Sequence, residues 1–377
     1  MFKDLFKDYI YPIAVFSGGM VGVGFLSLPY IAMKTGIWLM LLYFLVLTAL
    51  VVTINLIFCQ ISLKTPDFKR FPGFVGYYLG KRAKFFAMLS VIAGTVGVLL
   101  VYLLIGGQFL ASVFHGNVLT YVFIYFFIVS TIIYFDIKVV ARVEFWVIIL
   151  LFLSLFFVFI EGFSHIKLSN IFGNFPAAAG SRQAGQISNF FLPYGPLLFA
   201  LWGIGLIPEV EEMIKGNKKR LKPIVAISTT IISFFYLLFV FLILGITGNQ
   251  TDPTALQVLK NFLPNSLVSI SLLIGALATF TAFITQGIIF KKTLMFDLKI
   301  KHWQAFVMTC CPPLILFLLG LRGFIPLLSF IGGVLLGING ILILLMYKKI
   351  KGKNIIIYPL SLVFLLGVIY EIVYFIK

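Results

Sequence analysis

Eleven long apolar runs divide the sequence, and each is long enough to cross a lipid bilayer as a helix. A spanning helix needs about 20 apolar residues, and every backbone N–H and C=O group in lipid must find its partner inside the protein. Runs of this length therefore predict helices. The predicted spans are Tyr9–Met33, Gly36–Leu63, Phe85–Phe114, Leu119–Phe135, Val140–Phe163, Phe190–Ile214, Pro223–Ile246, Ser266–Phe296, Trp303–Leu321, Phe324–Tyr347 and Ile355–Ile376.

Composition argues against a chain of soluble domains, because 61% of the residues are hydrophobic, 11% are charged and the mean hydropathy is +1.12. The formal net charge of +17 also suits a nucleic-acid binder, but such proteins cluster Lys and Arg on one folded face. Here the basic residues fall in alternate short gaps between the apolar runs. This pattern indicates membrane topology, and no nucleic-acid partner is expected.

The distribution of basic residues predicts the orientation of the chain. If the N-terminus is cytoplasmic, most of the 29 Lys and Arg residues fall in gaps that face the cytoplasm, as the positive-inside rule requires. We therefore predict a multi-pass protein of the plasma (inner) membrane with an external C-terminus. The basic residues left on the outer side are Lys34, Lys167, Arg182, Lys260, Arg322 and Lys377.

Two gaps differ from the others in length and composition. Thr65–Arg82 mixes aromatic and basic residues, which predicts a short amphipathic element along the inner membrane interface. Ser164–Asn189 is the longest predicted external segment, and we expect it to cap an outer vestibule.

The cysteines and histidines show no pattern typical of an enzyme or of a metal site. The cysteines lie in or beside apolar runs, where they act as small hydrophobic residues, and the histidines are far apart in separate gaps. We therefore expect no enzymatic activity, no metal site and no cofactor. These residues are Cys59, Cys310, Cys311, His115, His165 and His302.

The first apolar run contains the segment SGGMVGVGFLSLPY at Ser17–Tyr30, which is a poor continuous helix. It holds four glycines within seven residues, and each costs about 1 kcal/mol relative to alanine inside a helix. Backbone groups freed by a break must line a cavity or hold a ligand. The alternative is that Gly18 and Gly22 form a GxxxG pair that only lets two helices approach closely.

The sixth run, Phe190–Ile214, is also interrupted, by three prolines and by Gly203 and Gly205. A proline costs about 3 kcal/mol inside a helix, so a kinked packing helix is one interpretation. However, the first and sixth spans are five apart and cross the membrane in opposite directions. Two broken helices at matching positions predict an inverted-repeat transporter with a binding site near the midplane. The predicted divisions are residues 1–163 (first five-helix repeat), 164–189 (external loop), 190–347 (second repeat) and 348–377 (eleventh helix).

These two spans also resemble a known family. GVGFLSLPY at Gly22–Tyr30 and LLFALWGIGLIPEVEEMIKGNKKRLKP at Leu197–Pro223 resemble the first and sixth helices of the amino acid/auxin permease family. The layout is similar to that of bacterial aromatic amino acid permeases, within the amino acid–polyamine–cation (APC) superfamily. The resemblance implies an all-α membrane protein with the leucine-transporter-type 5+5 inverted repeat, an eleventh transmembrane helix, and broken helices 1 and 6. It implies secondary active transport of an amino acid.

A zwitterionic amino acid fits two broken helices without any charged side chain. Backbone N–H groups near Val21–Gly24 would hold the carboxylate, and carbonyls near Phe199–Leu201 would accept from the ammonium group. The resemblance places substrate contacts in the same two segments. The predicted substrate-binding residues are Gly18, Gly19, Val21, Gly22, Val23, Gly24, Phe199, Ala200, Leu201, Trp202 and Gly203.

The coupling ion stays open between sodium and a proton. Hydroxyl groups in the eighth span, together with carbonyls of the first, would suit sodium, although such threonines usually bond to their own helix. The proton candidate is Glu209, beside Pro208. The alternative to a symporter is a receptor or facilitator of the same fold that binds an amino acid without pumping. We expect a monomer or a weak homo-oligomer. The predicted cation-binding residues are Gly19, Gly22, Ala278, Thr279 and Thr281.

Overall fold

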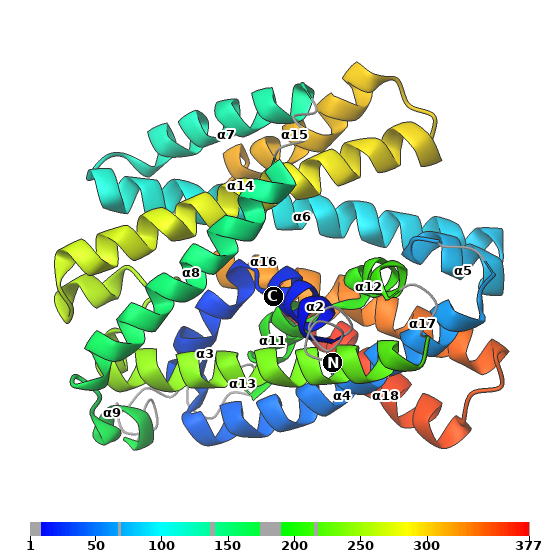
Figure 1. The fold of residues 1–377 in the computed structure, drawn as a ribbon, viewed down its shortest axis with the longest axis horizontal. Coiled ribbons are helices and arrows are strands. Elements are labelled where there is room, and N and C mark those ends of the chain that lie inside the picture. The colour runs from blue at the N-terminus through cyan, green and yellow to red at the C-terminus, as the bar shows by residue number, and fades with distance from the viewer. Residues whose placement is uncertain (1–8, 67–68, 136–139, 174–189, 215–217, 377) are drawn as a thin grey trace.

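A computed structural model describes residues 9–66, 69–135, 140–173, 190–214 and 218–376. Within these ranges the regular secondary structure is helical throughout, and no strand occurs. The helices form one bundle (Figure 1). The predicted all-α membrane fold is therefore confirmed.

Six helical segments in the described ranges are long and apolar enough to cross a membrane on their own. They match predicted spans 2, 3, 7, 8, 10 and 11. Their elements are α4 (Ile37–Lys64), α6 (Lys81–Phe114), α13 (Leu221–Thr247), α14 (Asn265–Asp297), the continuous α16 (Phe324–Ser329), η7 (Phe330–Leu336) and α17 (Gly337–Lys349), and α18 (Asn354–Ile376).

The other predicted spans are bent, interrupted or shorter helices. Span 1 consists of two helical halves with a bend between them, and together they count as a seventh spanning unit. Span 6 is also interrupted, between Leu201 and Ile204. Spans 4, 5 and 9 are shorter or less complete apolar helices. These elements are α2 (Tyr11–Met20), η2 (Val23–Ser27), α3 (Leu28–Thr35), α7 (Val118–Tyr134), α8 (Val140–Phe163), α11 (Tyr194–Leu201), η3 (Ile204–Leu206), α12 (Ile207–Met213) and α15 (His302–Leu318).

The broken helices lie in the middle of the bundle. In Figure 1, α2, α3, α11 and α12 occupy the centre, with α6, α7, α14 and α15 above them and α4, α13 and α18 below. Helix α14 packs on α6 and α8, and α17 packs on α18, so each outer layer is held together by its own contacts. The interrupted segments are therefore enclosed by continuous helices, which can satisfy backbone groups that lipid cannot.

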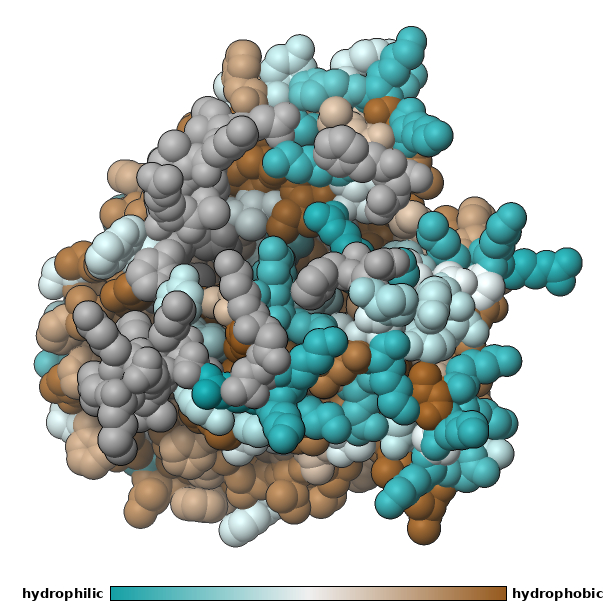
Figure 2. Space-filling model, turned by 45° about the vertical axis from the view of Figure 1, so that its right-hand side comes forward, coloured by the Kyte–Doolittle hydropathy of each residue, from teal (hydrophilic) through white to brown (hydrophobic). Residues whose placement is uncertain are grey.

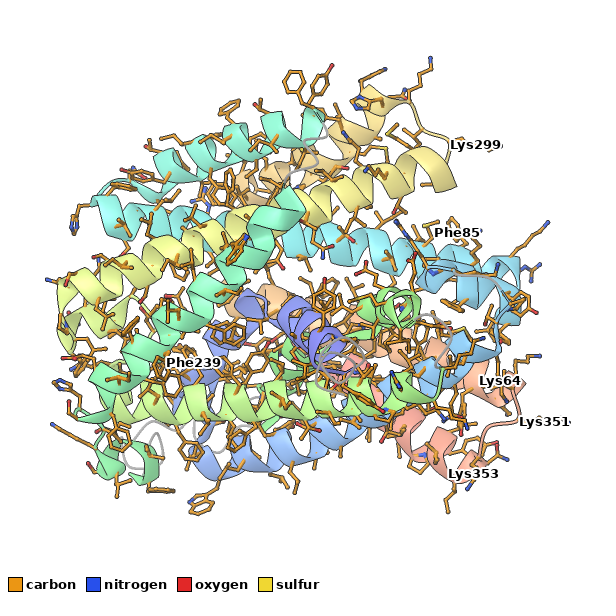
Figure 3. All side chains as sticks on the ribbon, viewed as in Figure 1. Lys64, Phe85, Phe239, Lys299, Lys351 and Lys353 are labelled. Atoms are coloured by element: carbon orange, nitrogen blue, oxygen red, sulfur yellow. The ribbon has the colours of Figure 1, made fainter. Side chains whose placement is uncertain are left out.

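Lysines from three predicted cytoplasmic gaps lie at one end of the bundle. Lys64, Lys299, Lys351 and Lys353 are all labelled at the right of Figure 3. In Figure 2, which brings that side forward, hydrophilic side chains gather there, and hydrophobic side chains cover much of the remaining face. These lysines of three predicted cytoplasmic gaps thus share one end of the bundle. Which end faces the cytoplasm stays a prediction.

The two unusual gaps each contain a short helix. The predicted amphipathic element is α5 (Phe71–Leu79), whose Tyr77 is exposed. The predicted external segment Ser164–Asn189 begins with α9 (Leu168–Phe172), and its residues 174–189 lie outside the described ranges. The predicted cap over an outer vestibule and the division into two five-helix repeats remain predictions.

Candidate functional site

The break in span 1 is a two-residue extended segment between two helices of different type. Helix α2 ends at Met20, and Val21 (ψ 94°) and Gly22 (φ −115°, ψ −174°) are extended. The chain then resumes as the 3₁₀ helix η2 and continues into α3, with a bend of 53° between the two halves. The broken first helix that the glycines predict is present.

Two hydroxyl groups and one backbone N–H donate to carbonyls at and beside this break. The Tyr236 hydroxyl donates to the Met20 carbonyl at 3.0 Å, and the Ser27 hydroxyl donates to the Gly24 carbonyl at 2.7 Å. The Val21 N–H donates to the Gly18 carbonyl at 3.1 Å. The N–H groups that open η2 have no acceptor within the helix, because the first turn of any helix lacks one. The break therefore presents donors, which suits an anion.

The break in span 6 likewise separates the end of one helix from the start of the next. Helix α11 ends at Leu201, Trp202 is extended (ψ 109°), and Gly203 (φ −115°, ψ 8°) leads into η3. The last carbonyls of a helix have no intrahelical donor, and here the Trp202 N–H donates to the Phe199 carbonyl at 3.3 Å. The end of α11 thus presents acceptors and the negative end of a helix dipole, which suits a cation.

The two breaks lie against each other. A Cβ atom on Gly24 would lie 2.6 Å from Phe199 Cδ1 and 3.5 Å from Ala200 Cα. On the other side of the break, a Cβ on Gly203 would lie 2.7 Å from Phe16 Cζ. A Cβ on Gly19 would lie 2.8 Å from a methyl carbon of Leu206. Only glycine permits this approach, and it brings the predicted substrate residues of spans 1 and 6 together.

Tyrosines from two continuous helices complete the surroundings of the break. The Tyr102 hydroxyl of α6 lies 3.5 Å from the Cβ position of Gly22, and Tyr236 of α13 is fully buried. Phe25 stacks on Tyr236 with ring centroids 5.4 Å apart, and Phe239, labelled in Figure 3, meets Phe25 edge-on at 4.8 Å. Neither tyrosine could be singled out from the sequence, because the chain has 16 Tyr and 43 Phe, most of them in the apolar runs.

Span 6 keeps accessible surface at its break. Phe199 and Trp202 are half-buried, and Gly205 is exposed, with no atom within 4 Å of its Cβ position. By contrast, Val23 and Gly24 of span 1 are buried. The aromatic walls of a substrate site would therefore come from the sixth span.

A cavity of about 1110 Å³ is lined by residues of spans 1, 3, 10 and 11. Its lining includes Tyr30 of α3, Gln108 of α6, Ser329 of α16 and Tyr374 of α18, and none of the predicted substrate residues. The sequence predicts a cavity between the broken helices, whereas Gly24 packs directly on Phe199 in this structure. The cavity is thus a vestibule that reaches α3, after the span 1 break, and Leu192, just before α11.

The vestibule wall carries charges of both signs. Lys34 and Arg322 line it together with Asp252. Burial raises the pKa of the Asp252 carboxyl above its ordinary value, and hydrogen bonds from the Thr254 N–H and hydroxyl oppose this shift. Ligands that enter the vestibule therefore meet two cationic side chains.

The predicted cation-binding residues do not form one cluster through their contacts. The Thr279 hydroxyl donates to the Ala276 carbonyl of its own helix at 2.8 Å and faces Gly106 of α6. The Thr281 hydroxyl donates to the Ala278 carbonyl at 3.1 Å. These are the local bonds that threonine usually makes in membrane helices, and the sodium site stays a prediction.

The predicted proton residue, Glu209, lies in the first turn of α12 with its side chain exposed. Its neighbour Glu211 accepts a hydrogen bond from the Ser62 hydroxyl of α4. Among the described residues, no group of three or more His, Cys, Asp or Glu side chains is placed to hold a metal ion. The proton-binding role of Glu209 stays a prediction.

Solved structures share this architecture. MhsT in complex with L-phenylalanine matches with a TM-score of 0.62 over 97% of both chains, at 14% sequence identity. A mutant of the Eremococcus coleocola manganese transporter matches with a TM-score of 0.63, over 98% of this chain and 86% of that one, at 13% identity. No curated protein matches the chain by sequence. These matches show that the chain has the fold of MhsT and the manganese transporter, the leucine-transporter type, in which the breaks of spans 1 and 6 lie at the centre of the bundle.

The family model of tryptophan/tyrosine permeases matches residues 7–366 of the 377. The chain belongs to the tryptophan/tyrosine permease family, and it is a transporter rather than an enzyme. This result corrects the resemblance to amino acid/auxin permeases. The motifs at Gly22–Tyr30 and Leu197–Pro223 encode helix breaks, which any transporter with this architecture needs, so they cannot discriminate between its families.

Proposed function

We propose that this protein is a secondary active transporter that carries an aromatic amino acid across the plasma membrane by alternating access, in symport with a cation, H⁺ or Na⁺. The observation that carries the proposal is the contact of Gly24 with Phe199 and Ala200. It sets the donor end of η2 against the acceptor end of α11. A zwitterion bridging the two ends would satisfy both sets of backbone groups.

The side chains around the breaks favour an aromatic substrate. Phe199 and Trp202 offer half-buried flat surfaces on span 6, and flat rings pack well on one another at offset or edge-on geometry. Membership of the tryptophan/tyrosine permease family supports the same substrate class. The hydroxyl of Tyr102 in α6 lies beside Gly22 of span 1. It adds a polar group next to the N–H donors that would bind the carboxylate.

Counterflow tests the transport step independently of the driving ion. Proteoliposomes preloaded with unlabelled tryptophan, tyrosine or phenylalanine should take up the radiolabelled amino acid, and those preloaded with glycine should not. An imposed gradient of protons or sodium should then drive accumulation above the external concentration. Counterflow without accumulation under either gradient would identify a facilitator, and the absence of both would refute the proposal.

A further inference from the structure

Glu371 is a buried carboxylic acid in α18 that has no part in the substrate site above. Its side chain is 1% exposed. Its Oε1 atom lies 2.9 Å from the Cβ position of Gly195 in α11 and 3.1 Å from that of Gly333 in η7. Two glycines thus leave room for the carboxyl group, which occupies a notch between the start of span 6 and the π-helical segment of span 10.

The notch supplies no positive charge from the described residues. Glu371 forms no ion pair or hydrogen bond with any of them. The titratable groups near Glu371 on the neighbouring helices are Tyr194 of α11 and Tyr43 of α4, and η7 has no titratable residue. On α18 itself Tyr370 is adjacent, whereas the titratable residues of α17 lie at its far end, Tyr347–Lys349. An unpaired carboxylate is costly in such surroundings, and a proton is the natural counter-charge.

A second buried polar group without a partner lies beside the acid. The Tyr194 hydroxyl is buried and has no hydrogen-bond partner among the described residues. Its ring packs against Gly367, one helical turn before Glu371 on the same face of α18. The notch therefore contains a buried carboxyl and a buried phenol without a partner, which marks a polar site rather than apolar packing.

The notch adjoins the vestibule. Ser329 and Tyr374 line the vestibule. The Cβ position of Gly195 lies 2.6 Å from Ser329 Cα, and Tyr374 is three residues beyond Glu371 on α18. The carboxyl therefore lies next to residues that contact the vestibule lining.

The notch is also connected by packing to the candidate substrate site. The Cβ position of Gly332 in η7 lies 3.1 Å from Phe199 Cβ, and Phe199 packs on Gly24. Movement of η7 away from α11 would therefore shift the aromatic wall of the break. A π-helical segment inside a helix is itself a feature often found at functional sites.

From this geometry we propose that Glu371 is a proton-binding site of the transport cycle. This proposal rests on the transport function proposed above. A hydronium ion in the vestibule transfers its proton to the carboxylate and becomes water, and the carboxylate becomes the neutral acid that the closed notch accepts. Loss of the proton leaves a carboxylate that needs water, which opens α11 from η7 and moves Phe199. Proton binding and the state of the substrate site are thereby coupled.

The test compares Glu371→Gln with wild type in sodium-free proteoliposomes. Counterflow of tryptophan should persist in the variant, because a neutral amide replaces the neutral acid. Accumulation driven by an imposed pH gradient should fall to the level of protein-free liposomes. Glu161→Gln, at an exposed carboxyl of α8, is the matched control and should accumulate substrate like wild type.

Three outcomes would overturn the proposal. The first is full pH-driven accumulation by Glu371→Gln, and the second is equal loss in Glu161→Gln. The third is wild-type accumulation under a sodium gradient but not under a pH gradient, which leaves the transport function intact. Absence of wild-type counterflow would instead refute the transport function itself.

Two further measurements do not depend on transport by Glu371→Gln. Wild type should lose thermal stability relative to this variant as the pH rises from mildly acidic to alkaline, because only the wild-type side chain acquires a charge. Gly333→Ala should displace the carboxyl and lose pH-driven accumulation, whereas Gly94→Ala in α6, whose nearest neighbour is 3.8 Å away, should not. Parallel stability curves, or unchanged accumulation in Gly333→Ala, would contradict the assignment.

Discussion

The breaks in spans 1 and 6 have the same origin in sequence but are held in different ways. In span 1, hydroxyl groups of Tyr236 and Ser27 take up the Met20 and Gly24 carbonyls. In span 6, the bonds at the break run between backbone atoms, Trp202 N–H to Phe199 O and Leu206 N–H to Gly203 O. The span 1 break thus has a donor from α13 in addition to bonds within its own chain, whereas the span 6 bonds named here come from its own chain alone.

This difference suggests a division of roles. A break locked by a buried tyrosine keeps its N–H donors in one geometry, which suits recognition of the constant carboxylate of an amino acid. A break with half-buried Phe199 and Trp202 and open space at Gly205 can adjust to the variable side chain. We therefore expect substitutions at span 1 to affect binding of every substrate, and those at span 6 to have smaller effects.

The largest effect is expected from Gly24→Val. Its Cβ would overlap the Phe199 ring at 2.6 Å, and overpacking in a dense interior costs about 1–3 kcal/mol. Binding of all aromatic substrates should weaken by about tenfold to a hundredfold, as measured by ligand-induced thermal shift. Gly205→Val is the control, since no atom lies within 4 Å of its Cβ position. Equal binding by the two variants would contradict the contact.

An intermediate effect is expected from Tyr236→Phe. This change removes the hydroxyl that donates to Met20 and leaves a buried carbonyl without its donor, at a cost of about 1–3 kcal/mol. The melting temperature of the purified protein should fall, and substrate binding should weaken as the span 1 break loosens. Tyr77→Phe, at an exposed tyrosine of α5, should change neither. A stable Tyr236→Phe with normal binding would show that span 1 is not locked from α13.

The smallest effect is expected from Gly203→Ala. The added methyl would approach Phe16 Cζ at 2.7 Å and Met20 Sδ at 3.2 Å, both at the far ends of side chains that can rotate. Its cost should therefore be about 1 kcal/mol or less, at the low end of the overpacking range. The same thermal-shift assay should rank this variant well above Gly24→Val. A loss as large as that of Gly24→Val would remove the contrast between the two breaks.

The sequence was sufficient to predict where the helices break. Glycines at Gly18–Gly24 and prolines around Gly203 penalise a continuous helix whatever surrounds them, because propensity is a local property of the chain. It also predicted the all-helical membrane fold, since a run of about 20 apolar residues has few other solutions in lipid. The sequence motifs were less informative about the family, because motifs that produce helix breaks are common to transporters of this architecture.

Only the tertiary structure decided which groups meet at those breaks. Tyr102 and Tyr236 come from helices far away in sequence, and Glu371 lies almost half the chain's length from Gly195, beside which it packs. Nothing in a residue's own neighbourhood marks such a contact, since an aromatic or acidic residue in an apolar run looks the same wherever it points. Apolar length and helix breakers act locally and can be recognised in the chain, whereas the partners of a freed backbone group or a buried acid depend on how distant helices pack.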